Sequence, residues 1–120
     1  HILCSKGSKK VEKELQALLD SSMYGKQGKI YMGKDLWHLR SLVMTDPVDA
    51  IIGDTHGKFI ARDAKIPLFR FGFPIFDRVN LHRYPIVGYQ GMINMVTTIC
   101  NKFIDITDDT CDERHFEMMR

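Results

Sequence analysis

The chain has 120 residues, a net charge of +2 and a hydrophobic content of 44%. This length is enough for one domain, and the balanced charge argues against a protein that binds nucleic acid or an anionic membrane through clustered Lys and Arg. No apolar run approaches the ~20 residues of a transmembrane helix.

The first residues and the cysteines indicate the context of the chain. The sequence starts with His1-Ile2-Leu3-Cys4, without an initiator Met and without a signal-peptide pattern, so we expect a piece of a longer polypeptide. The three cysteines, Cys4, Cys100 and Cys111, show no short spacing, which argues against a disulfide framework or a zinc knuckle. A cytoplasmic location fits this usage.

The first half of the chain shows two strand–helix pairs. Ile2-Leu3-Cys4 is a short apolar run that predicts a buried strand. Apolar residues at helical spacing from Lys9 to Asp20 predict a helix with Ser8 as its N-cap. A second strand is predicted over 29–32. The helix after it should end at Asp46-Pro47, because the residue before a proline disfavours the helical conformation.

The second half repeats this order. An apolar strand is predicted over 50–52, a short helix over 58–64, and a fourth strand over 68–71. A long loop then leads to a helix with two adjacent apolar stripes, which predicts packing on two sides. The stripes are Met92, Val96, Ile99 and Phe103, and Ile93, Cys100 and Ile104. Cys100 is therefore predicted to be a core residue.

Alternation of strands and helices predicts an α/β fold, a three-layer sandwich with a mostly parallel sheet of about four strands. An upstream strand–helix unit would complete this sheet. We expect residues 1–120 to form one domain. Residues 106–120 are expected to be a C-terminal tail that docks on the domain or on a partner, because Phe116, Met118 and Met119 follow an acidic, polar stretch.

The carboxyl ends of parallel strands are where such folds bind ligands. Asp54, His56, Asp77 and His82 follow the third and fourth predicted strands, so they could converge on a divalent metal or act as an acid–base site. The alternative is structural, with turn hydrogen bonds and a salt bridge between loops.

The glycine pair at 88 and 91 and Arg70 are two further features of interest. Gly88 and Gly91 at a helix start could hold a phosphate, or they could let the turn close and the helix pack tightly. Arg70 lies within a strand whose neighbours look buried, so it needs a carboxylate, and Asp77 and Asp54 are the candidates.

The segment around the long loop resembles a known family. It reads Ile66-Pro67-Leu68-Phe69-Arg70-Phe71-Gly72-Phe73-Pro74-Ile75-Phe76-Asp77-Arg78, then Leu81-His82-Arg83 and Val87-Gly88-Tyr89-Gln90-Gly91. With Gly33 to Leu42 and the first four residues, it closely resembles the C-terminal domain of nitrogenase component 1, in the branch of the molybdenum–iron protein beta chains. The resemblance covers nearly all of the chain, and its Gly-Phe-Pro-Ile-Phe-Asp-Arg run is specific.

The resemblance implies a Rossmann-like domain whose first strand–helix unit lies upstream of His1. It also implies an α2β2 complex of alpha and beta chains that receives electrons from an iron protein and reduces dinitrogen to ammonia. The P-cluster, an iron–sulfur cluster, and the iron–molybdenum cofactor would be held by other parts of that complex. No cysteine of this chain matches a cluster motif, so we expect no catalytic, cofactor or metal ligand here, and no activity of this fragment alone.

Departures from the family pattern leave alternatives open. Asp54, His56 and Val79-Asn80 differ from the residues usual in the family, which leaves the subgroup open. Vanadium and iron-only nitrogenase beta chains share much of this domain, and the cofactor-assembly scaffold is an alternative that shares it less well, because its loop keeps less of Ile75-Phe76-Asp77-Arg78. A free-standing metal- or anion-binding domain is an alternative of another class. Under the nitrogenase reading, the loop is a structural and interface element. Its candidate residues are Arg70, Asp77, Arg78, His82, Arg83, Gly88, Tyr89 and Gly91.

Overall fold

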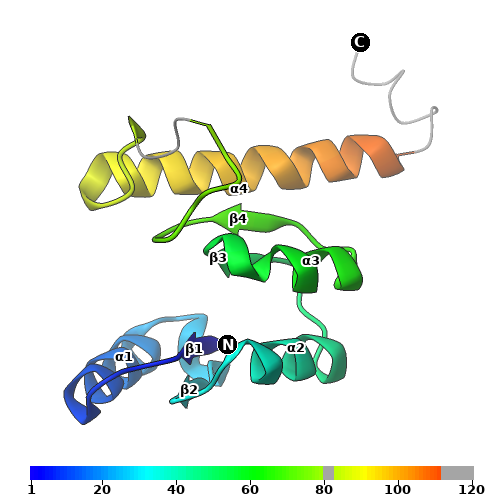
Figure 1. The fold of residues 1–120 in the computed structure, drawn as a ribbon. Coiled ribbons are helices and arrows are strands. Elements are labelled where there is room, and N and C mark those ends of the chain that lie inside the picture. Colours follow the sequence, from blue (N-terminus) through cyan, green and yellow to red (C-terminus); the bar gives the residue numbers. More distant parts are fainter. Residues whose placement is uncertain (80–82, 112–120) are drawn as a thin grey trace. The chain divides into compact units, whose positions relative to one another are not determined.

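The computed structural model describes residues 1–79 and 83–111. The chain divides into two compact units, His1–Val48 and Asp49–Arg120. Each unit contains two strands that pair in parallel, with helices before or after them in the sequence (Figure 1). The prediction that residues 1–120 form one domain stays a prediction.

The first unit pairs β1 (Ile2–Cys4) with β2 (Ile30–Met32), so that Leu3 lies opposite Tyr31. Helix α1 (Lys9–Ser21) connects them, and helix α2 (Leu36–Thr45) follows β2. Ser8 caps α1 as predicted, because its side chain accepts a hydrogen bond from the backbone of Val11 at 3.4 Å. Asp35 caps α2 in the same way through the backbone N–H of His38 at 3.0 Å. Both helix starts are thus encoded by the sequence.

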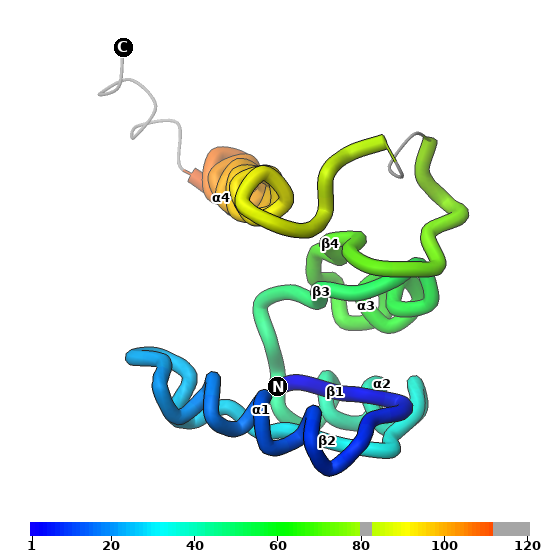
Figure 2. The backbone as a smooth tube through the Cα atoms, turned by 90° about the vertical axis from the view of Figure 1, so that its left-hand side faces the viewer, coloured from blue at the N-terminus to red at the C-terminus, as the bar shows by residue number. Residues whose placement is uncertain are grey.

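The second unit pairs β3 (Ile51–Gly53) with β4 (Leu68–Arg70), so that Ile52 lies opposite Phe69. Helix α3 (Lys58–Ala64) connects them, preceded by a 3₁₀ turn, η2 (Thr55–Gly57). The loop after β4 leads to helix α4 (Gly88–Thr110), and α3 lies against the strands on the side away from α4 (Figures 1 and 2). The buried apolar core of this unit contains Ile51, Ile60, Ala61 and Phe69.

Helix α4 departs from the prediction in two ways. It continues to Thr110, so residues 106–110, which we assigned to the tail, are helical, and residues 112–120 lie outside the described part of the chain. Among the described residues, the helix packs on one side, through contacts such as the Phe69–Phe103 ring pair at 6.1 Å. The predicted second packed side is wrong for the described structure, because Met92, Ile93, Val96, Cys100 and Ile104 are exposed.

The predicted fold class is confirmed, since four parallel strands alternate with helices. Backbone hydrogen bonds join these strands in two pairs, one in each unit, where we expected a single sheet. Each strand is only 3 residues long and therefore offers few ladder hydrogen bonds. Within residues 1–79 and 83–111, no helix is long and apolar enough to cross a membrane.

Candidate functional site

An ion pair between Arg70 and Asp77 joins the end of β4 to the loop that follows it. The Nε–H of Arg70 donates to Asp77 Oδ1 at 2.8 Å, and its Nη2 donates to Oδ2 at 2.6 Å. Both side chains are only 13% exposed. A planar guanidinium and a carboxylate bind most strongly in this bidentate geometry. The predicted need of Arg70 for a carboxylate is confirmed, and Asp77 is the partner.

Thr55 is the third member of this network, and the sequence did not reveal it. Its side chain is 1% exposed, and its hydroxyl donates to Asp77 Oδ1 at 2.9 Å. The same hydroxyl accepts from the backbone N–H of Phe76 at 3.2 Å, while the backbone N–H of Thr55 donates to the carbonyl of Pro74 at 3.2 Å. The start of η2, directly after β3, is therefore fastened to the loop by three hydrogen bonds. We call Thr55, Arg70 and Asp77 the brace.

The brace lowers the pKa of the Asp77 carboxyl group. Hydrogen bonds from Arg70 hold the pKa of Asp77 well below the ordinary value of an aspartate, and the hydroxyl of Thr55 and the positive charges of Arg70 and Arg78 act in the same direction. Partial burial opposes the shift but is outweighed. Asp77 is therefore ionised throughout the physiological pH range, which suits a fixed structural anion.

Arg78 lies next to the brace but is held less tightly. Its Nη1 donates to the backbone carbonyl of Asp77 at 2.7 Å and approaches Asp77 Oδ2 at 3.5 Å. Its side chain is 50% exposed. Because Arg70 already makes the two short contacts with the carboxylate, the two guanidiniums and one carboxylate leave about one positive charge uncompensated at this position.

The predicted metal site is only partly assembled in the described structure. Asp54 Oδ1 accepts from the backbone N–H of His56 at 2.9 Å and lies 3.3 Å from its ring Nδ1, while Asp77 belongs to the brace. The ring of His56 packs edge-on against Phe76 at 5.8 Å. His82 lies outside the described residues. Among the residues that are described, no group of three His, Cys, Asp or Glu side chains could hold a metal ion.

The two glycines at the start of α4 have steric roles. Gly88 has a φ of +71°, a conformation that side-chain-bearing residues rarely adopt. Gly91 is buried, and a Cβ there would lie 2.4 Å from the carbonyl carbon of Ile86. These facts support the structural reading of the glycine pair. Between them, Tyr89 is 95% exposed, and Arg83 earlier in the loop is exposed too.

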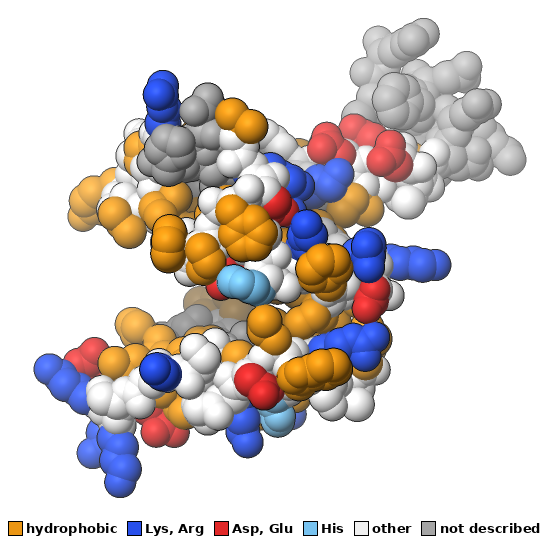
Figure 3. All heavy atoms as spheres, in the orientation of Figure 1, with side chains coloured by type: hydrophobic (Ala, Val, Ile, Leu, Met, Phe, Trp, Pro, Cys, Tyr) orange, Lys and Arg blue, Asp and Glu red, His pale blue; other side chains and the backbone are white. Residues whose placement is uncertain are grey.

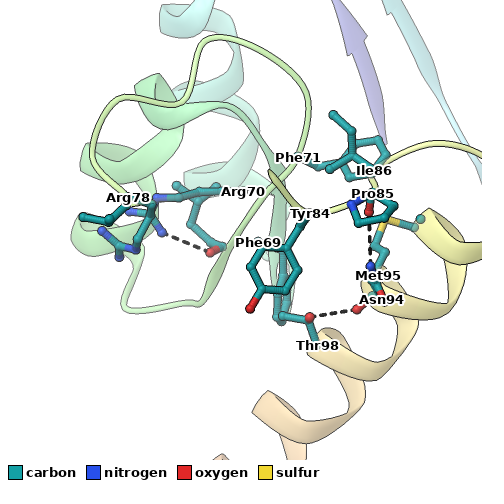
Figure 4. Close-up of a pocket in the computed structure, with 13 residues that line it drawn as sticks. Phe69, Arg70, Phe71, Arg78, Tyr84, Pro85, Ile86, Asn94, Met95 and Thr98 are labelled. Carbon is teal, nitrogen blue, oxygen red and sulfur yellow. Dashed lines mark hydrogen bonds between the residues drawn. The ribbon is translucent and has the colours of Figure 1, made fainter. Parts of the chain in front are cut away.

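A pocket of about 490 Å³ opens beside the brace, between β4, the loop and the first turns of α4 (Figure 4). Arg70 and Arg78 lie on one side of it, and Asn94, Met95 and Thr98 of α4 lie on the other. Asn94 donates to the carbonyl of Pro85 at 3.3 Å, which holds the loop against the helix. Most of the remaining wall is apolar or aromatic: Leu68, Phe69, Phe71, Val79, Tyr84, Pro85 and Ile86.

The loop also presents large apolar side chains to solvent. Phe73 is 90% exposed, although it directly follows the turn at Gly72. Further exposed apolar side chains of the loop and the start of α4 are Phe76, Val79, Tyr84, Val87, Tyr89 and Met92. Hydrophobic side chains are correspondingly visible over this part of α4 on the face shown in Figure 3. Exposed aromatic and apolar groups at this density are typical of an interaction surface.

Comparison with known proteins identifies the family of this chain. Residues 1–104 match the family described as nitrogenase component 1 type oxidoreductase. The chain belongs to this family. The resemblance predicted from the loop and its flanking segments is thereby confirmed.

Relatives within the nitrogenase component 1 family share about half of the residues. The chain is 53% identical over 108 residues to the nitrogenase molybdenum-iron protein beta chain of Azospirillum brasilense, which covers 90% of this chain and 21% of that protein. It is 47% identical over 112 residues to the corresponding beta chain of Crocosphaera subtropica, covering 93% of this chain and 22% of that protein. The chain thus spans about a fifth of the length of these curated relatives.

A solved structure supports the fold as well. The chain superposes on a chain of nitrogenase Cp1, determined at pH 6.5, with a TM-score of 0.82 and 35% identity, covering 93% of this chain and 24% of that one. The α/β fold predicted from strand and helix alternation is therefore the fold of a nitrogenase component 1 structure.

Proposed function

We propose that the chain is the C-terminal domain of the beta subunit of a nitrogenase molybdenum–iron protein, with a structural and interface role. The observation that carries this proposal is the similarity to beta chains of that name along nine-tenths or more of the sequence. In the full protein, the domain would support electron delivery to the site where dinitrogen is reduced to ammonia.

The described residues supply no ligand set for an iron–sulfur or iron–molybdenum group. Cys4, Cys100 and Cys111 are separate free cysteines, and none belongs to a cluster of metal-binding side chains in the described part of the chain. We therefore derive no redox step from these residues. The P-cluster and the iron–molybdenum cofactor would be bound by other parts of an α2β2 complex that works with an iron protein.

The contribution of this domain is to hold the described parts of its long loop, residues 71–79 and 83–87, in place. The brace fastens Phe76 and Asp77 to the start of η2, and Asn94 holds Pro85 against α4. With both ends of the loop held, Phe73 and the other exposed apolar side chains are presented in a defined arrangement. Rigid aromatic side chains are effective interface anchors because little entropy is lost when they bind. The alpha chain is the partner that we propose for this surface.

Reconstitution of the full-length protein tests the proposal. The protein that carries these 120 residues is co-expressed with its alpha chain and supplied with iron protein and ATP, and acetylene reduction is measured. We expect activity from the complex and none from the 120-residue chain alone. A stable complex that binds cofactor but reduces nothing would indicate an assembly scaffold, and activity of the 120-residue chain alone would refute the structural role.

A matched pair of variants tests the interface separately. Phe73→Ser should weaken association with the alpha chain, as measured by analytical ultracentrifugation of the full-length proteins. Phe59→Ser is the control, because Phe59 is also exposed but belongs to α3 and not to the loop, and Lys58 and Arg62 lie over its ring. Equal effects of the two changes would show that the loop is not the interface.

A further inference from the structure

The pocket beside the brace has a buried floor and an exposed rim. Among the described residues that line it, Phe69 and Gly91 are buried, whereas Arg78, Val79 and Tyr84 are exposed (Figure 4). Its volume of about 490 Å³ lies within the range of small-molecule sites, about 300–1,000 Å³. Such sites combine mostly apolar walls with a few polar groups that orient the ligand. The pocket therefore suits a ligand with its apolar part at the floor and its polar part at the rim.

Arg78 is the charged group of the rim, and one edge of its guanidinium is open. In Arg70, the edge formed by Nε and Nη2 holds both carboxylate oxygens of Asp77. In Arg78, Nη1 is the nitrogen that contacts Asp77, at 2.7 Å from its carbonyl oxygen and 3.5 Å from Oδ2. Nε and Nη2 of Arg78 take no part in the contacts between described residues. The edge that binds a carboxylate in Arg70 is therefore open for a second carboxylate in Arg78.

The charge at the rim favours a ligand with a single negative charge. Arg70 and Arg78 carry two positive charges, and Asp77 is in contact with both. No acidic residue is among the described residues that line the pocket. A carboxylate at Arg78 balances the remaining charge, whereas a phosphate dianion brings one negative charge more than the site compensates. Since an uncompensated charge is costly to take out of water, a carboxylate is the better match.

We propose that this pocket binds a small amphipathic carboxylate, with its apolar chain against Phe69 and its carboxylate on Nε and Nη2 of Arg78. Medium-chain alkanoates belong to this class. The chain of such a ligand also covers the exposed apolar rim at Val79 and Tyr84. The proposal goes beyond the structural role of the domain and does not depend on it, since all of these residues belong to one compact unit.

Equilibrium dialysis of the full-length protein with radiolabelled octanoate tests the proposal. Octanoate should bind saturably, with one molecule for each copy of the chain. Three competitors define the ligand class: 1-octanol has the chain without the charge, acetate has the charge without the chain, and octyl phosphate carries a second negative charge. Each should displace octanoate about tenfold less effectively than unlabelled octanoate does.

A substitution on α4 tests the location of the site. Thr98→Trp places a large side chain at the pocket and should abolish the binding of octanoate. Thr107→Trp is the matched control, because Thr107 is also exposed on α4 but does not line the pocket. The two hydroxyls also make equivalent bonds, at 2.8 Å to the carbonyls of Asn94 and Phe103.

A substitution at the rim tests the charge contact. Arg78→Gln should raise the Kd of octanoate about tenfold, the lower end of what a hydrogen bond to a charged group contributes, because Arg78 is half exposed. Arg62→Gln is the control, since Arg62 is exposed on α3 and does not line the pocket. Circular dichroism spectra and thermal midpoints of all variants, compared with the parent, distinguish a lost site from a lost fold.

Saturable binding that is lost in Thr98→Trp, weakened in Arg78→Gln and retained in both controls would support the proposal. Absence of saturable octanoate binding to the full-length protein would overturn it, including the case in which another polypeptide segment fills the pocket. Undiminished binding in a folded Thr98→Trp variant, or an unchanged Kd in Arg78→Gln, would overturn it as well. Tighter binding of octyl phosphate, or equal binding of 1-octanol, would refute the assignment of a carboxylate.

Discussion

The hydroxyl of Thr55 offers a sharp test of the brace, because two substitutions separate its polar role from its packing role. Thr55→Val keeps the shape of the side chain and removes the hydroxyl. Thr55→Ser keeps the hydroxyl and removes one methyl group. Thr55 is 1% exposed, so water cannot replace the hydrogen bonds lost in Thr55→Val or the methyl group lost in Thr55→Ser.

The expected costs differ in size. The hydroxyl donates to a carboxylate at 2.9 Å and accepts from the Phe76 amide at 3.2 Å. A hydrogen bond to a charged group contributes about 1.5–3 kcal/mol and a neutral one about 0.5–1.5 kcal/mol, so Thr55→Val should lower the free energy of unfolding by about 2–4.5 kcal/mol. Thr55→Ser removes one buried methyl group and should cost about 1 kcal/mol.

Urea unfolding of the 120-residue chain, followed by far-ultraviolet circular dichroism, measures both costs. Hydrogen exchange of the peptide 73–79 adds local information, because the Phe76 amide should exchange faster in Thr55→Val than in Thr55→Ser. Fluorescence of Trp37 is unsuitable, because Trp37 belongs to the other compact unit. If Thr55→Ser is as costly as Thr55→Val, the methyl group and not the hydroxyl is what matters at this position.

Three further predictions concern the same unit. The unfolded chain takes up a proton at Asp77 near the ordinary pKa of 3.8, while the folded pKa is lower, so the stability from this group is complete above about pH 5 and is lost as pH falls toward the folded pKa. Thermal midpoints measured from pH 6 to pH 2.5 should therefore fall less steeply in Asp77→Asn than in the parent. Gly91→Ala should lower the thermal midpoint, because its Cβ would collide with the backbone of Ile86, whereas Gly53→Ala has open space and should not; equal shifts would contradict the close approach. Arg70→Ala should lower the midpoint more than Arg70→Lys, which retains the charge; indistinguishable midpoints would show that the ion pair contributes nothing.

The sequence predicted the elements well, because their signals are local. The cap at Ser8 and the short apolar strands depend on neighbouring residues, and the structure has them close to the expected positions. The choice between Asp77 and Asp54 as partner of Arg70 depended on the path of the loop, which no local pattern encodes. Thr55 was missed for the same reason, since its partners lie 21 and 22 residues away.

The exposure of α4 was mispredicted for a different reason. Its apolar stripes have the pattern of a helix packed on two sides. This pattern shows which faces of the helix are apolar, but it does not show which part of the protein, or which partner, covers each face. In the described structure, Phe103 contacts Phe69 on one side while Ile93 and Cys100 face solvent. The chain spans about a fifth of its relatives, so the sequence can carry the pattern of a contact whose other half lies elsewhere.

The hydrogen bonds that the Asp77 carboxylate already accepts decide whether it can also bind a metal ion or a proton. An ionised carboxylate has about four acceptor positions. Oδ1 accepts from Thr55 and from Arg70 Nε, while Oδ2 accepts from Arg70 Nη2 and lies 3.5 Å from Arg78. Asp77 therefore has no free position for a metal ion, and its lowered pKa makes it a poor proton acceptor. This argues against a metal site or general base built on Asp77. The guanidinium of Arg78, which is half exposed, is one described group of this loop that can still bind a partner.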